Sequence, residues 1–194
     1  MIRQPVKEES AIMVLGVDPG FANTGLAVVE SYSGGFRLID SELVVTKKAD
    51  KRSRLNLRSS IDDKKRMFLI YTALENIMKR NPNLNVISVE AYSVSGARGG
   101  NAWKVALIYG GVMFWGFSHR MYTAPFLPMD VKKRFGKKNS SKEDIVKSLR
   151  KEVDGFSTCI DGYAKIKQEH ISDATAHAVL MIEEIQQNRV MFGI

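Results

Sequence analysis

Three acidic side chains that are far apart in the sequence stand at the ends of predicted elements. Asp18 directly follows the apolar residues 12–17, and Glu90 directly follows the apolar-rich residues 84–89. The third acid, Asp173, lies in HISDATAHAV, among alanines small enough to let a helix lie close to a sheet. Carboxylates that converge from separate elements are ligands that Mg²⁺ and Mn²⁺ prefer, and a pair of such ions can drive phosphodiester hydrolysis. We therefore interpret the three acids as candidate metal ligands.

Asp18 and Asp173 each also have a simpler structural interpretation. Asp before Pro-Gly is a common turn signal, so one alternative is that Asp18 only opens a turn. His170, Asp173 and His177 are spaced so that they lie on one helix face. We expect His170 and Asp173 in the first turn of that helix, so the alternative is that they only serve the helix N-terminus, where the helix dipole stabilises an acid. The convergence of three acids favours the metal hypothesis over three separate structural roles.

The elements that must position these residues alternate between strands and helices. Residues 12–17, 24–30 and 36–46 are predicted to form an antiparallel meander, because each segment is rich in apolar and β-branched residues between turn signals. Two more strands are predicted at residues 84–90 and 120–124, the latter broken by Pro125 and Pro128. Helices are predicted at residues 61–80, 101–118, 129–135, 140–153 and 168–188, with residues 154–166 irregular. The fourth helix begins with a capping box formed by Ser140 and Glu143.

Composition limits the class of protein. The chain has 194 residues, of which 44% are hydrophobic, so residues 11–190 are expected to form a single domain behind a flexible N-terminal extension, residues 1–10. The net charge of +8 suggests an acidic partner such as nucleic acid, although a basic protein without such a partner is the alternative. The single cysteine, Cys159, excludes an intramolecular disulfide, and no apolar run suits a membrane span. We expect the cytoplasm or another reducing, DNA-containing compartment.

The predicted helix at residues 101–118 is apolar on nearly every side. Such a helix is either central in its domain or shared with another subunit. We expect part of it to form a homodimer face, with Ile108, Val112 and Trp115 as the candidate contact residues.

Four motifs in this order resemble those of RuvC-type Holliday-junction resolvases, of the ribonuclease H-like superfamily. They are LGVDPGFANTG at residues 15–25, VISVEAY around Glu90, DVKKRFGKKNSSKEDIVKSL at residues 130–149, and HISDATAHAV at residues 170–179. The resemblance implies an α/β fold with a mixed five-stranded sheet flanked by helices. It also implies a homodimer that nicks a four-way DNA junction in pairs, leaving 5′ phosphate and 3′ hydroxyl ends.

The resemblance also assigns residues. Asp18, Glu90 and Asp173 match three metal-binding acids of the family, and His170 matches a fourth position that holds Asp or His, together implying two Mg²⁺ or Mn²⁺ ions. Lys142 matches a basic catalytic residue beside the scissile phosphate. The predicted DNA contacts are Lys51, Arg52, Arg54, Arg58, Tyr92, Arg98, Lys132, Lys133, Lys137 and Lys138.

The sequence departs from the family in two places. Three residues after Glu90 the family has an aromatic that wedges into the junction, but here that position is Ser93, so Tyr92 is the candidate wedge. The chain also has extra length before the first strand, and the segment at residues 47–58 is more basic than the resemblance leads us to expect. We interpret this segment as a DNA arm, with a solvated loop as the alternative. Other functions left open are a ribonuclease H-like nuclease acting on RNA or branched replication intermediates, and a catalytically weak junction-binding module.

Overall fold

The computed structural model describes residues 11–46, 59–91, 102–136 and 140–188. Its elements are β1 (Met13–Asp18), β2 (Asn23–Tyr32), β3 (Gly35–Val45), α1 (Ser59–Arg80), β4 (Val86–Glu90), α2 (Ala102–Ser118), β5 (Tyr122–Phe126), α3 (Pro128–Phe135), α4 (Lys142–Glu152), β6 (Val153–Asp154), α5 (Phe156–Ile160) and α6 (Lys165–Gln187). Each strand and helix predicted from the sequence is present, with small shifts at its ends. Within the described residues, no helix combines the length and apolarity that crossing a bilayer requires.

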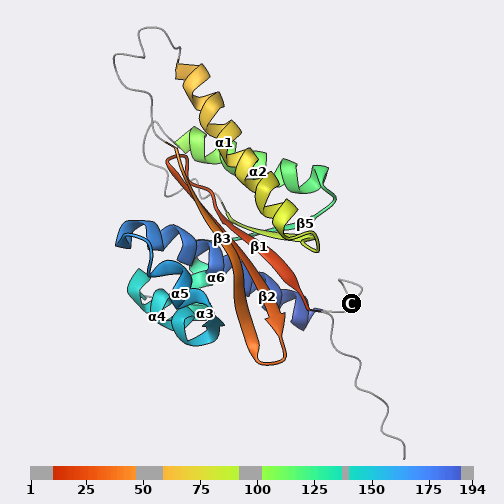
Figure 1. Cartoon of the computed structure of the whole chain (residues 1–194), viewed down its shortest axis with the longest axis vertical. Coiled ribbons are helices and arrows are strands. Elements are labelled where there is room, and N and C mark those ends of the chain that lie inside the picture. Colours follow the sequence, from red (N-terminus) through yellow and green to blue (C-terminus); the bar gives the residue numbers. More distant parts are fainter. Residues whose placement is uncertain (1–10, 47–58, 92–101, 137–139, 189–194) are drawn as a thin grey trace, which may run out of the picture.

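Helices cover both faces of one mixed sheet (Figure 1). On β1, Leu15 and Val17 belong to the apolar core shared with α1 and α2, whereas Val14 belongs to the core shared with α3 to α6. Successive residues of a strand point to opposite faces, so a strand buried on both faces is apolar along its whole length. This explains why residues 12–17 form a continuous apolar run.

The sheet topology brings two of the predicted acids to the same edge. The strand order is β5-β4-β1-β2-β3-β6, and β1 runs parallel to β4 with Val17 opposite Val89. The carboxyl ends of parallel neighbours meet at one edge of a sheet, which is where α/β proteins place their sites. Asp18 and Glu90, each the last residue of its strand, are therefore neighbours.

The sheet has six strands, so the predicted count of five was wrong. The extra strand, β6, consists of Val153 and Asp154, which pair with Phe36 and Arg37 of β3. The stretch predicted to be irregular also contains α5. A two-residue strand is too short to carry a periodic pattern, because its pairing depends on the distant strand β3 rather than on its own sequence.

Three predicted boundaries also differ from the structure. The N-cap of α4 is Ser141, whose side chain accepts a hydrogen bond from the backbone of Asp144, so the capping box lies one residue after the predicted pair. Pro125 lies within β5 instead of breaking it, which is tolerated because β5 is an edge strand. Helix α6 begins at Lys165, so His170 and Asp173 lie beyond its first turn. The dipole alternative for Asp173 therefore loses its basis.

Helix α2 turns a different face outward from the one predicted. Ile108, Val112 and Trp115 are buried in the core against the sheet, so the candidate contact residues were wrong. The exposed apolar residues of α2 are Trp103, Leu107, Phe114 and Phe117. A helix that is apolar all round gives no sequence signal for which side meets the sheet, and packing alone decides it.

Candidate active site

Helix α6 brings His170 to the end of β1. The Nδ1 atom of His170 lies 2.6 Å from Oδ2 of Asp18 in a hydrogen bond between residues 152 positions apart. This bond raises the pKa of His170 above its ordinary value, although burial of the ring opposes the effect. The predicted proximity of the last helix to the first strand is present in the structure.

Two glycines allow α6 to lie this close to the sheet. A Cβ atom on Gly16 of β1 would lie 1.8 Å from the carbonyl oxygen of Ala174. A Cβ atom on Gly25 of β2 would lie 2.1 Å from the carbonyl oxygen of His170. Contacts this short do not occur, so a side chain at either position would push the helix, and with it His170, away from Asp18. Two of the three glycines of the LGVDPGFANTG motif, Gly16 and Gly25, thus have a packing role at the site.

Glu90 and Asp173 complete an acidic cluster. Burial, together with the negative charges of Asp18 and Asp173 and a hydrogen bond with Asp18, raises the pKa of Glu90 to about 8. Burial and the charge of Asp18 also raise the pKa of Asp173. Carboxylates whose charges destabilise one another in a buried setting are stabilised by a cation, and such perturbed groups are typical of functional sites.

Lys142, the first residue of α4, supplies a positive charge beside these acids. Its Nζ atom donates hydrogen bonds to Oε2 of Glu169 at 3.0 Å and to Oδ2 of Asp173 at 3.2 Å. Partial burial lowers the pKa of Lys142, but Asp173 and Glu169 outweigh it and hold the pKa above its ordinary value. The ammonium is therefore charged at neutral pH and lies at the rim of the acidic cluster.

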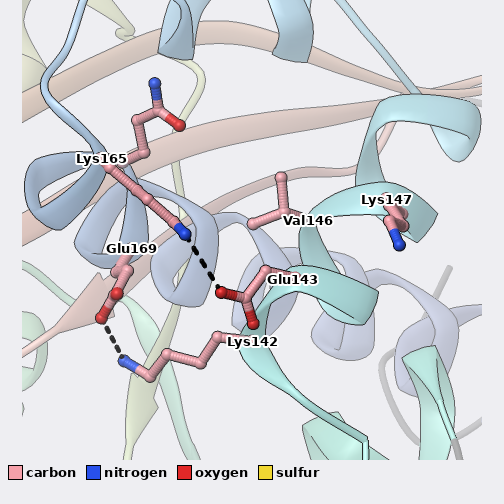
Figure 2. Close-up of a pocket in the computed structure, with 7 residues that line it drawn as sticks. Lys142, Glu143, Val146, Lys147, Lys165 and Glu169 are labelled. Atoms are coloured by element: carbon pink, nitrogen blue, oxygen red, sulfur yellow. Dashed lines mark hydrogen bonds and ion pairs between the residues drawn. The ribbon is translucent and has the colours of Figure 1, made fainter.

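Glu169 is a site residue that the sequence did not predict. Glu169 lies on α6 and is linked to Lys142 on α4 (Figure 2). Both residues line a pocket of about 200 Å³. A second ion pair, between Lys165 and Glu143, joins the same two helices at this pocket (Figure 2). The only sequence signal was its position four residues before Asp173, on the same helix face. Its partner on α4 is a tertiary contact that no local pattern encodes.

The donor set is suited to a hard divalent cation. Asp18, Glu90 and Asp173 offer carboxylate oxygens and His170 an imidazole nitrogen, which are ligand types of Mg²⁺ and Mn²⁺ sites. As they stand, however, no three His, Cys, Asp or Glu side chains of the described residues are grouped so as to hold a metal ion. Asp18 is hydrogen-bonded to His170, and Asp173 to Lys142.

Most of the predicted DNA contacts lie outside the described residues. Lys51, Arg52, Arg54, Arg58, Tyr92, Arg98, Lys137 and Lys138 fall there, as do Ser93 and the predicted N-terminal extension, residues 1–10. Lys132 and Lys133 are exposed on α3, where Lys133 lies 3.6 Å from Asp130. Of these two lysines, neither forms an ion pair with the four clustered residues in the described structure.

A family model matches residues 14–181, which include all four clustered side chains and Lys142; its description is crossover junction endodeoxyribonuclease RuvC. The chain belongs to the RuvC family. A curated relative, the crossover junction endodeoxyribonuclease RuvC of Brachyspira hyodysenteriae, is 25% identical over 139 residues, 71% of this chain and 79% of the relative.

Solved structures share the RuvC fold with this chain. The T. thermophilus RuvC in complex with a Holliday junction substrate matches with a TM-score of 0.66 and 23% identity, covering 87% of this chain and 91% of that one. The yeast mitochondrial Holliday junction resolvase matches with a TM-score of 0.62 and 13% identity, covering 93% and 86%. At these identities the likeness supports the fold, which is the predicted α/β, ribonuclease H-like arrangement with a sixth strand added.

Proposed function

We propose that this protein is a structure-specific endonuclease that resolves four-way DNA junctions by paired, metal-dependent hydrolysis of phosphodiesters. The observation that carries the proposal is the convergence of Asp18, Glu90 and Asp173, with His170 and Lys142, at one edge of the sheet of a RuvC family member. The RuvC of T. thermophilus has been solved with a Holliday junction substrate, which supports the choice of DNA. The net charge of +8 suits binding to the phosphate backbone.

We assign the four clustered residues as ligands of Mg²⁺ or Mn²⁺, two ions in each site. Such ions, when bound, supply a water activated for attack on phosphorus and stabilisation of the leaving oxygen. The chain orients the reaction, because Asp18 and Glu90 end rigid strands and His170 and Asp173 lie on a helix packed against them. Lys142 places an ammonium group beside Asp173, where it would attract and orient the scissile phosphate. The products are 5′ phosphate and 3′ hydroxyl ends.

Cleavage in pairs requires two sites related by symmetry, and α2 offers a surface for assembling them. Trp103, Leu107, Phe114 and Phe117 follow one another at intervals of four, seven and three residues, so they line one exposed stripe of the helix. Contiguous apolar surface of this kind is typical of a protein interface. We assign this stripe as the contact of a homodimer, whose two-fold axis would present two sites to the equivalent strands of a junction.

The predicted DNA contacts remain part of the proposal. Residues 47–58 are proposed as a basic arm and Tyr92 as the wedge that holds the junction open, with Lys132, Lys133 and Arg98 among the phosphate contacts. The protein would act in the cytoplasm or another compartment that contains DNA.

The test is cleavage of a labelled immobile four-way junction beside a linear duplex of the same sequence, with and without Mg²⁺. We expect paired nicks that ligase can seal, formed only with the metal and not in the duplex. Asp18→Asn should abolish cleavage while junction binding persists, because affinity arises mainly from phosphate contacts. Asp161→Asn is the matched control, since it removes an exposed carboxylate that is paired with Arg150 on the surface.

Three results would contradict the proposal. Equal cutting of duplex and junction would indicate a general nuclease. Faster cutting of RNA or of a branched replication fork would indicate one of the other ribonuclease H-like activities. Tight junction binding without cleavage at any Mg²⁺ or Mn²⁺ concentration would indicate a binding module.

A further inference from the structure

Two polar atoms are buried on the α6 side of the sheet without a hydrogen-bond partner among the described residues. They are Oγ of Ser88 in β4 and Nδ1 of His177 in α6. Ser88 is 0% exposed and His177 is 1% exposed. A buried polar atom left unpaired destabilises a fold, so native proteins pair nearly all of them with protein or with internal water.

Ser88 precedes Glu90 by two residues on β4. Its neighbours Ile87 and Val89 belong to the core beneath α1 and α2, so Ser88, and Glu90 two residues later, point to the face that α6 covers. On either side in the sheet, Ser88 is paired with Gly16 of β1 and Ala124 of β5. Both neighbours are small, so neither covers Ser88 with a long side chain.

His177 lies one helical turn after Asp173, on the same face of α6. Gly16 contacts α6 at Ala174 and Ala178, which flank His177 on the helix. Ser88 is the partner of Gly16 in the sheet, so the turn of α6 that carries His177 passes over the strand position beside Ser88. His177 and Ser88 therefore lie at the same level of the sheet, one turn of α6 after Asp173 and two residues before Glu90.

We propose that Ser88 and His177 together bind one internal water molecule, and that this water helps to hold the carboxylates of Glu90 and Asp173 in position. Burial lowers the pKa of His177 to about 4, so at neutral pH the ring is uncharged and one nitrogen accepts a hydrogen bond. A hydroxyl and an imidazole without other partners among the described residues are the polar groups that a buried water pairs with. Ser88 and His177 are then positioning residues, which act through Glu90 and Asp173.

The first test is structural and does not depend on the proposed function. A high-resolution crystal structure of the wild-type protein should show water density within about 3.2 Å of both Ser88 Oγ and His177 Nδ1. The ¹⁵N chemical shifts of His177 should report a neutral ring, and the shift of Nδ1 should change in Ser88→Ala. A dry site, or a direct hydrogen bond between the two side chains, would overturn the water assignment.

The second test measures metal binding and rests on the proposed function. Because groups behind metal ligands commonly affect affinity by 10–100-fold, Ser88→Ala should weaken Mn²⁺ binding, followed by electron paramagnetic resonance without DNA, by about tenfold. Thr175→Val is the matched control, since it removes a buried hydroxyl of α6 that donates within the helix to the carbonyl of Ile171. It should leave Mn²⁺ affinity unchanged.

The outcomes separate the two claims. Wild-type affinity in Ser88→Ala, or an equal loss in Thr175→Val, would overturn the positioning role. A wild-type protein that binds no Mn²⁺ would overturn the proposed metal chemistry and the positioning role together, whereas the water assignment would still be decided by the crystal and by ¹⁵N shifts. If His177→Leu folds, it should reproduce the weakening seen in Ser88→Ala, and wild-type Mn²⁺ affinity in that variant would contradict the shared role.

Discussion

The variant Gly25→Ala should separate the helix from the sheet at the active site. A Cβ atom at Gly25 would meet the carbonyl oxygen of His170 at 2.1 Å and its carbonyl carbon at 2.5 Å. Real Cβ atoms stay beyond 3.0 Å from such neighbours, so β2 and α6 must move apart by about 0.9 Å at this point. The backbone of Gly25 is not among the positive-φ glycines, so the added methyl group acts through this contact and not through backbone strain.

The size of the effect follows from the bond that the movement breaks. His170 and Asp18 are 2.6 Å apart, and a displacement of this size takes them beyond ordinary hydrogen-bonding distance. Overpacking of this kind destabilises a fold by about 1–3 kcal/mol, and misplacing a catalytic group by about 1 Å slows a reaction by about 100-fold. We therefore expect Gly25→Ala to fold with reduced stability and to cleave junctions about 100-fold more slowly.

Urea unfolding and single-turnover junction cleavage at saturating Mg²⁺ measure the two effects separately. Gly162→Ala is the matched control, because a Cβ atom there has nothing within 4 Å, and it should retain stability and rate. If Gly25→Ala kept both the wild-type stability and the wild-type rate, the close approach of α6 would not be what positions His170.

Three further predictions concern assembly, pH and the turn that carries Asp18. Phe114→Glu on the exposed stripe of α2 should weaken dimerisation by about 3 kcal/mol in sedimentation experiments; an unchanged dimer would place the interface elsewhere. The pKa of His177 falls from 6.5 to about 4 on folding, so the unfolded chain binds the extra proton and stability decreases as pH falls from 6.5 to 4. The stability of His177→Leu relative to the wild type should accordingly rise by about 3 kcal/mol between pH 7 and pH 4 in urea titrations, and a constant difference would mean that folding does not lower the pKa of the ring. Arg66 is buried and donates to the carbonyl of Phe21 and the hydroxyl of Thr46, so Arg66→Met should destabilise the fold by about 1–3 kcal/mol; equal urea midpoints would show that water replaces the guanidinium.

The sequence by itself determined the longer elements, though not β6 or α5, and the acids that they carry. The apolar run of β1 ends at Asp18 and that of β4 ends at Glu90, and these local patterns suffice because a buried strand must be apolar along its length. The one-face spacing of His170, Asp173 and His177 likewise follows from helix geometry alone. Local signals of this kind depend on neighbouring residues, so they can be read before the fold is known.

Tertiary structure alone decided the contacts between distant segments. The pairing of β6 with β3 and the bond from Lys142 to Glu169 join residues far apart in sequence. For α2 the sequence is apolar on every side, and only packing against the sheet determines that Val112 is buried and Phe114 exposed. The same holds for Oγ of Ser88 and Nδ1 of His177, which are unpaired among the described residues because of where α6 lies over β4. Such features arise because burial and hydrogen bonding are properties of assembled surfaces, which no single segment of chain specifies.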